Sequence, residues 1–184
     1  MSEAANGVAG DSALAFAESR PESTRTRLLT WQDPLETVAA GAGLSGLEYM
    51  REIASGEIPP PPIAVTLNMR MVSVERGRAV FEGEPGEEHY NPIGVVHGGY
   101  AATLLDSALG CAVHATLAAG EAYTTLTLET KFVRAITRDT GRVRADAEVV
   151  HRGRRHATAE ARLTDVKTGK LLAHATTTCM VMAP

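Results

Sequence analysis

A stretch of twenty residues limits how this chain of 184 residues can fold. Residues 98–117 read GGYAATLLDSALGCAVHATL, which predicts a long helix with apolar side chains on every side. Such a helix is too apolar to face water, so other elements have to surround it. Between His97 and Gly120 the only acid or base other than histidine is Asp106.

The surrounding elements are predicted to be strands. Residues 69–85, MRMVSVERGRAVFEGEP, indicate two strands joined by a turn at Arg76 and Gly77. Four more strand-like runs follow the helix, at residues 123–135, 141–150, 156–165 and 171–182, and the first two alternate apolar and polar residues. Six runs are thus strand-like, and we expect about five of them to form antiparallel strands around the one long helix, an arrangement that predicts an α+β fold.

The N-terminal third has a different pattern. Residues 1–27 are rich in Ala, Gly, Ser and Glu without periodicity, which predicts a disordered tail. Residues 28–62 predict a helical extension that ends in the stiff connector PPPP. We place the core domain at residues 63–184.

Two short helices are expected in the extension. The first begins at DPLE, where Asp33 can be the N-cap and Pro34 fits the first helical position. The second begins at SGLE, where Ser45 and Glu48 have capping-box spacing, and it should end at Gly56.

Composition and charge exclude several classes of protein. The net charge is −4 and no basic stripe with interleaved aromatic residues occurs, so no nucleic-acid partner is expected. No run approaches the roughly 18–20 apolar residues of a membrane span, and no signal peptide is recognisable. Cys111 and Cys179 lie in apolar stretches and are interpreted as reduced thiols. We therefore expect a cytoplasmic protein with no membrane partner.

Asp106 is the first candidate for a functional residue. An ionised carboxylate that leaves water without a partner costs several kcal/mol, so an apolar helix rarely carries one for packing alone. Asp106 could instead lie on a wet side of the helix or cap a backbone group. Its apolar flanks favour a functional role, because perturbed ionisable groups tend to lie at active sites.

The residues HGG at 97–99 mark the start of the same helix. Glycines let the backbone approach a ligand closely, and free N–H groups at a helix N-terminus attract a negatively charged oxygen. The glycines could also only shape the turn. Together with Asn91 and Asp106, the motif suggests an oxyanion site and an acid/base group. His97 is interpreted as fixing the loop by hydrogen bonds to the backbone, although its usual pKa also permits acid/base catalysis.

No metal or other cofactor is expected. The remaining histidines, at positions 89, 114, 151, 156 and 174, show no spacing that would gather metal ligands with either cysteine. A serine nucleophile elbow and a Walker-type loop are also not found in the sequence.

The run HYNPIGVVHGGYAATLLDSALG, followed by YTTLTLETKFVRA, closely resembles the PaaI-like branch of the hotdog-fold acyl-CoA thioesterases. The resemblance covers about residues 63–182 and implies a hotdog fold that hydrolyses acyl-CoA thioesters. It says nothing about the extension that precedes them.

The resemblance also implies roles for individual residues. Asn91 and the Gly98 N–H would engage the thioester, and Asp106 would act as nucleophile or general base. Thr125 would orient water, or Thr124 if the alignment shifts by one residue. Desolvation by neighbouring leucines should raise the pKa of Asp106. The depth of the acyl pocket should depend on side chains such as those of Tyr100, Leu104 and Phe132.

Coenzyme A carries phosphate groups, for which arginine is well suited. Candidates are Arg134 and the three arginines of HRGRR, which are Arg152, Arg154 and Arg155. The alternative is that HRGRR is simply a solvated charged turn.

Helix geometry suggests that the site is shared between two chains. Gly98 and Asp106 are eight residues apart, so about 12 Å separates them along the helix axis. An antiparallel helix related by a two-fold axis would bring Asp106 of one subunit beside Gly98 of the other. The resemblance implies the same homodimer, often paired into a homotetramer. Two alternatives to the hydrolase are a non-hydrolytic acyl-CoA-binding or sensing protein and a hotdog hydratase.

Overall fold

The computed structural model describes residues 24–183, so most of the expected tail at residues 1–27 lies outside the described part. Three short helices come first, α1 (Pro34–Ala40), α2 (Gly46–Ser55) and α3 (Pro62–Thr66). They are followed by β1 (Met69–Glu75), β2 (Arg78–Gly83), the 3-10 turn η2 (Glu87–His89), α4 (Gly98–His114), β3 (Ala122–Phe132), β4 (Val143–Arg152), β5 (His156–Asp165) and β6 (Leu171–Met182). None of the described helices is long and apolar enough to cross a membrane.

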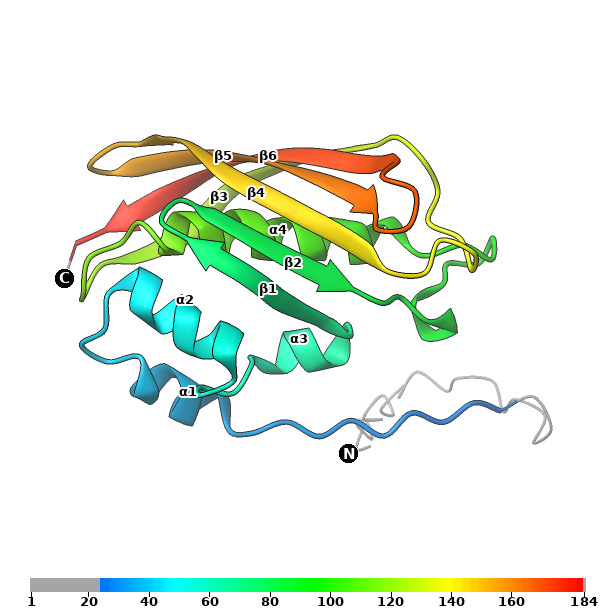
Figure 1. Ribbon diagram of the computed structural model, residues 1–184, viewed down its shortest axis with the longest axis horizontal. Coiled ribbons are helices and arrows are strands. Elements are labelled where there is room, and N and C mark those ends of the chain that lie inside the picture. Colours follow the sequence, from blue (N-terminus) through cyan, green and yellow to red (C-terminus); the bar gives the residue numbers. More distant parts are fainter. Residues whose placement is uncertain (1–23, 184) are drawn as a thin grey trace, which may run out of the picture.

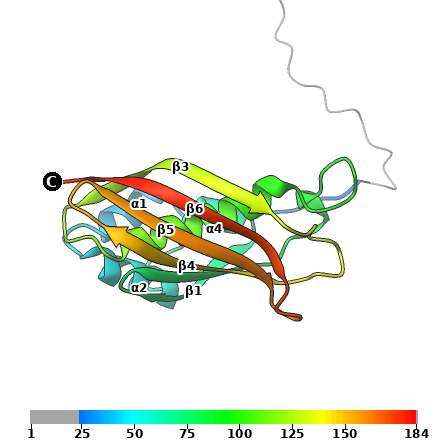
Figure 2. The same cartoon turned by 90° about the horizontal axis from the view of Figure 1, so that it is seen from above.

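The six strands form one antiparallel sheet in the order β1-β2-β4-β5-β6-β3. Figure 1 shows the sheet arched over α4, with the three short helices gathered on the other side next to β1. Seen from above, the strands run side by side across the helix (Figure 2). The predicted α+β hotdog arrangement is confirmed, with six strands in the described residues rather than about five, because the β1–β2 hairpin joins the same sheet as the four later strands.

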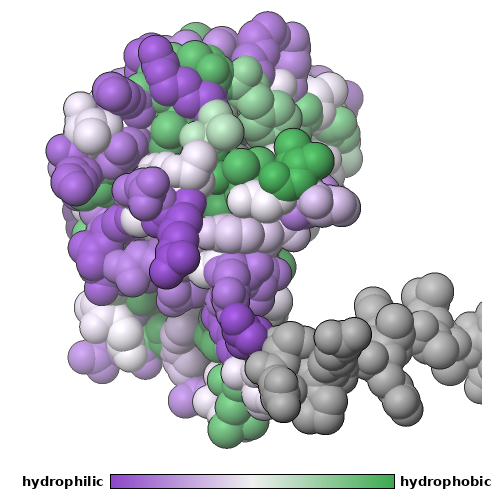
Figure 3. Space-filling view, turned by 90° about the vertical axis from the view of Figure 1, so that its right-hand side faces the viewer, coloured by the Kyte–Doolittle hydropathy of each residue, from purple (hydrophilic) through white to green (hydrophobic). Residues whose placement is uncertain are grey.

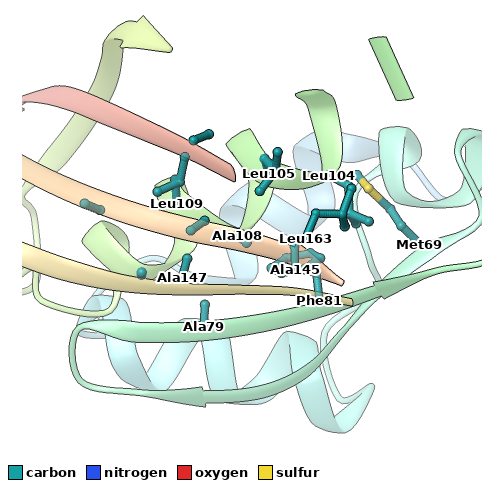
Figure 4. Packing of buried hydrophobic residues seen from close by; sticks show 14 of the residues in the cluster. Met69, Ala79, Phe81, Leu104, Leu105, Ala108, Leu109, Ala145, Ala147 and Leu163 are labelled. Atoms are coloured by element: carbon teal, nitrogen blue, oxygen red, sulfur yellow. The ribbon is translucent and has the colours of Figure 1, made fainter. Parts of the chain in front are cut away.

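The core lies between α4 and the concave face of the sheet. Leu104, Leu105 and Leu109 of α4 are completely buried. Figure 4 shows these leucines against Leu163 and the small side chains of the strands. Most inward positions of three central strands are alanines, namely Ala145, Ala147, Ala157, Ala159, Ala161, Ala173 and Ala175. Because these side chains are small, the sheet can close around the bulky helix without leaving voids.

Both predicted helices of the extension are present with their predicted caps. The Asp33 side chain accepts a hydrogen bond from the Leu35 N–H at 2.9 Å. Ser45 and Glu48 form the capping box, and α2 ends at Gly56, which has a left-handed φ of 87°.

Two boundaries differ from the sequence prediction. The proline run was expected to be extended throughout, but its last residue, Pro62, begins α3, where proline fits because its fixed φ is helical. The long helix ends at His114 instead of Leu117. Its last turn tightens there, since the N–H groups of Thr116 and Leu117 donate to carbonyls three residues earlier.

The extension docks directly on the end of α4. The Gly46 N–H donates to the Leu117 carbonyl at 3.1 Å. A Cβ on Gly46 would lie only 1.9 Å from the His114 carbonyl oxygen, so this close approach requires glycine. Met50, one turn further along α2, is buried in the same hydrophobic cluster as α4. The extension therefore packs against the core, and its helices cover part of α4.

Candidate active site

Asp106 lies in the middle of α4 and its side chain is half-buried. The Thr125 hydroxyl on β3 donates a hydrogen bond to Asp106 Oδ1 at 3.3 Å. Burial raises the pKa of Asp106, and the hydrogen bond from Thr125 opposes this effect. Thr124 is exposed, and neighbouring side chains on a strand point to opposite faces. The geometry therefore pairs Thr125, and not Thr124, with Asp106.

A row of α4 side chains next to Asp106 was missed by the sequence interpretation. Ser107, Cys111 and His114 are spaced so that they share one side of a helix, which was the available signal. Burial raises the pKa of the Cys111 thiol to about 12, so it stays protonated at neutral pH. The His114 ring lies near those of Tyr49 and Tyr123, at centroid distances of 5.6 and 5.5 Å. Burial lowers the pKa of His114, which favours the neutral imidazole.

The loop before α4 is held by His97. His97 is the N-cap of α4, and its Nδ1 accepts a hydrogen bond from the Gly99 N–H at 2.8 Å. The backbone N–H of His97 donates to the His89 carbonyl at 2.8 Å. These are the contacts expected of a histidine that fixes the loop. Among the described residues nothing accepts a hydrogen bond from the Gly98 N–H, which is the first of the helix.

Asn91 uses its side-chain oxygen to shape the same loop. Oδ1 accepts hydrogen bonds from the N–H groups of Ile93 and Val95, at 3.1 and 3.3 Å. With its oxygen engaged in this way, Asn91 can offer its amide NH₂ group as a donor to a ligand.

A hollow of about 230 Å³ lies beside the start of α4 and is lined by His97, Gly98, Phe132 and Arg134, among others. A Cβ on Gly98 would lie 3.2 Å from the Phe132 ring, so glycine lets the two elements meet closely. Arg134 Nη1 donates to the Leu171 carbonyl at 2.6 Å, which holds the guanidinium at this rim. The end of the molecule shown in Figure 3 is mostly hydrophilic but carries a group of strongly hydrophobic residues.

The arginines of the β4–β5 turn lie at the other end of the same chain. Arg152 pairs with Glu121 at 3.1 Å. Arg154 and Arg155 are exposed, and the turn lies beside the end of β6 that pairs with the start of β3. Phe132, at the far end of β3, is ten residues from Ala122 at the start of the strand, which corresponds to about 33 Å along it. Within one chain, Arg134 is therefore the candidate cation near Gly98.

The predicted site residues thus form two groups within one chain. Asp106 and Thr125 make up one, and Asn91, His97 and Gly98 at the start of α4 make up the other. Gly98 and Asp106 lie on the same continuous helix, α4, where eight residues correspond to about 12 Å. The first group offers a carboxylate for acid/base or nucleophilic chemistry, and the second offers hydrogen-bond donors for a negatively charged oxygen.

Two residues expected to line an acyl pocket do not do so. Tyr100 and Leu104 are buried in the hydrophobic core. Both point toward the sheet because they share the buried side of α4 with Leu105 and Leu109, and only Phe132 of the expected set lines a hollow.

Comparisons with known proteins agree with this fold. Residues 93–172 match the family model of the Thioesterase superfamily. The chain is 32% identical, over 107 residues, to the 1,4-dihydroxy-2-naphthoyl-CoA hydrolase of Listeria monocytogenes, covering 58% of this chain and 85% of that protein. Among solved structures, a phenylacetic acid degradation-related protein from Ralstonia eutropha is 33% identical with a TM-score of 0.65, over 72% of this chain and 98% of that one. A mutant of the phenylacetic acid degradation protein PaaI from Thermus thermophilus is 30% identical with a TM-score of 0.59, over 65% of this chain and 97% of that one.

The raised pKa of Asp106 predicts how this residue affects stability. The contribution of Asp106 to the free energy of unfolding is fully present only below its ordinary pKa of 3.8. This contribution is lost as the pH rises through the higher pKa of the folded state, because burial then disfavours the ionised carboxylate. Asp106→Asn should therefore raise the melting temperature at pH 7–8 relative to the original protein, and the difference should disappear toward pH 4. Thermal denaturation followed by circular dichroism across this range measures it.

Asp165 is a suitable control, because its substitution should change the melting temperature in the opposite direction. Hydrogen bonds, chiefly from Thr168, lower the pKa of Asp165, so Asp165→Asn should lower the melting temperature at pH 7–8. If Asp106→Asn also lowers it there, the carboxylate is not in a desolvating environment.

Proposed function

This chain belongs to the hotdog-fold thioesterase superfamily and is a thioester hydrolase, and from this premise we propose that it hydrolyses acyl-CoA to the free acid and CoA. The observation that carries the proposal is the half-buried Asp106, whose pKa is raised by burial and which is held by the Thr125 hydroxyl. A base with a raised pKa takes a proton from water more readily than a fully solvated aspartate does.

The proposed reaction uses the two groups of residues together. The Gly98 N–H donates to the thioester carbonyl oxygen and stabilises the negative charge that forms there, and the Asn91 amide adds a second donor. Asp106 removes a proton from a water molecule, whose oxygen attacks the carbonyl carbon. The Thr125 hydroxyl donates its proton in a hydrogen bond to Asp106, and its oxygen can at the same time accept a hydrogen bond from that water.

The tetrahedral intermediate then collapses. Its carbon–sulfur bond breaks and CoA leaves as a thiolate, which is a good leaving group without a dedicated acid. In the alternative route, Asp106 attacks the carbonyl carbon directly and forms an anhydride, which water hydrolyses. Both routes need the carbonyl oxygen at Gly98 and the carbonyl carbon next to Asp106.

This requirement supports a site shared between two subunits. Within residues 24–183, β3 is an edge strand that pairs only with β6, and its Leu126 and Phe132 side chains are 51% and 59% exposed. An open edge with exposed apolar side chains favours pairing with a second strand. We propose that two copies associate through β3 and α4 about a two-fold axis, which places Asp106 of one subunit beside Gly98 of the other. Pairing of such dimers into a tetramer remains a prediction, as does the cytoplasmic location.

For the CoA phosphates, Arg134 is the cation that a single chain places beside Gly98. The turn that carries Arg154 and Arg155 lies far from Gly98 of its own chain. It could approach the CoA only from the second subunit, so we propose Arg134 as the main contact and retain the turn as an alternative.

The first test of this function is CoA release, measured with a thiol reagent on a panel of acyl-CoAs. Asp106→Asn keeps the shape of the side chain but removes the base, so kcat should fall by about 100-fold or more. Asp146→Asn is the matched control, because this carboxylate pairs with Arg78 on the outer face of the sheet and should leave turnover unchanged. Turnover of Asp106→Asn near that of the original protein would exclude the proposed base.

Co-expression tests whether the site is shared. Asn91→Asp keeps the oxygen that holds the loop but removes the amide donor, and both it and Asp106→Asn should be inactive alone. If Asn91 and Asp106 act from different subunits, each mixed dimer keeps one intact site. Random pairing makes about half of the dimers mixed, and one of the two sites in each is intact, so about a quarter of the original activity should return. Within-chain sites would all stay damaged, and no activity would return.

The charge of Arg134 can be tested through KM. Arg134→Gln should raise KM for acyl-CoA by about tenfold with little change in kcat, as expected for a lost charge-assisted hydrogen bond to phosphate. The effect should shrink at high salt, because salt screens the interaction. Combined Arg154→Ala and Arg155→Ala are measured beside it. If KM is unchanged in Arg134→Gln but rises in a salt-sensitive way in the double variant, the phosphates bind to the turn and not to Arg134.

A further inference from the structure

A second, larger cavity lies between the N-terminal extension and the core. Its volume is about 520 Å³, and α2, α3, β1 and α4 supply most of its walls. Met50 and Ile53 come from α2, Ile63 from α3 and Met71 from β1, so the walls on these sides are largely apolar.

The opposite wall is the row of α4 side chains that starts at Asp106. Asp106, Ser107, Cys111 and His114 all line the cavity. The cavity therefore begins at the proposed catalytic carboxylate and follows α4 for eight residues, which is about 12 Å. A carbonyl carbon held at Asp106 would direct the group bound to it into this space.

The chemistry of the walls selects against charge. The raised pKa of Cys111 and the lowered pKa of His114 leave both neutral at pH 7. Among the residues that the structure describes, Arg70 is the one cationic side chain that lines the cavity, and it is 67% exposed at the rim. An ionised ligand group would lose its hydration here without gaining a buried partner, which is costly. The phosphates of CoA are thus excluded, whereas an uncharged apolar group is well accommodated.

We infer that this cavity binds the acyl group of the substrate, and that the N-terminal extension determines which acyl groups are accepted. The inference rests on the proposed function. A cavity of about 150 Å³ is enough for a benzene molecule, and this one is more than three times larger. It fits a bulky, uncharged acyl group, either a fused aromatic system or an alkyl chain of medium length.

The two helices that face the Asp106 row lie outside the residues that the family model matches. The family match covers residues 93–172 and does not reach α2 or α3. The position of α2 is fixed by the contact of Gly46 with the end of α4, so its cavity-facing side chains are held at a constant distance from the Asp106 row. Ile53 is the side chain best placed for a test, because it is only partly buried and a larger residue would project into the cavity.

The test compares Ile53→Trp with Arg51→Trp, which adds the same side chain to an exposed position of the same helix. For 2-naphthoyl-CoA and decanoyl-CoA, Ile53→Trp should lower kcat/KM by about tenfold or more, because even one methylene group changes such discrimination by this amount. For acetyl-CoA the change should be below about threefold, and Arg51→Trp should affect neither class. Thermal denaturation shows whether both variants fold, and Ile53→Phe replaces the tryptophan variant if it does not.

A binding measurement separates failure of this inference from failure of the proposed function. The S-(2-naphthylmethyl) thioether of CoA lacks the thioester carbonyl and cannot be hydrolysed, and its affinity is measured by calorimetry. Tight binding that Ile53→Trp weakens and Arg51→Trp does not would support the cavity even if no acyl-CoA were hydrolysed. Hydrolysis of the bulky thioesters with the same kcat/KM in the folded Ile53 variant, or an equal loss for acetyl-CoA, would overturn the inference and leave the hydrolase intact.

Discussion

The fold depends on covering α4, a helix whose side chains are almost all apolar. Burial of apolar surface is worth about 25 cal/mol per Å², so a helix of this kind is stable only when other elements remove it from water. The sheet does this by presenting alanines toward the bulky leucines of the helix. Because alanine is small, six strands can curve closely around one helix, and the leucines fill the space that the alanines leave.

The arrangement leaves one side of α4 only partly covered. Asp106 is half-buried, at a place where the β3 edge and the extension cover the helix only partly. Complete burial would make an ionised Asp106 very costly, while full exposure would leave it with an ordinary pKa. Partial burial with one hydrogen bond from Thr125 lies between these extremes and raises the pKa without abolishing the charge.

The sequence predicted the parts that depend on local rules. The caps at Asp33, Ser45 and Gly56 follow from short-range hydrogen bonding, and the two-residue alternation marked the strands. The start of α3 and the end of α4 were missed because proline fits both an extended run and a first helical position, and because a last turn can tighten to 3-10 geometry without a sequence signal. In the site, the resemblance implied that Thr125 or Thr124 orients water, and the hydrogen bond of Thr125 to Asp106 comes from the structure. The cavity beside Asp106 was not expected, because it is formed by residues more than fifty positions apart, whose contact depends on how α2 docks.

The apolar character of α4 on all sides can be understood from three separate demands. Its leucines face the sheet, and the row from Ser107 to His114 faces the extension. The remaining strip, around Ala102 and Thr103, is half-buried and contains no charged residue. This strip lies between Gly98 and Asp106, so a two-fold axis passing through it would exchange these two residues between subunits. A charged side chain here would have to be desolvated when two such helices meet. Small uncharged residues at this position are therefore what the proposed shared site would require.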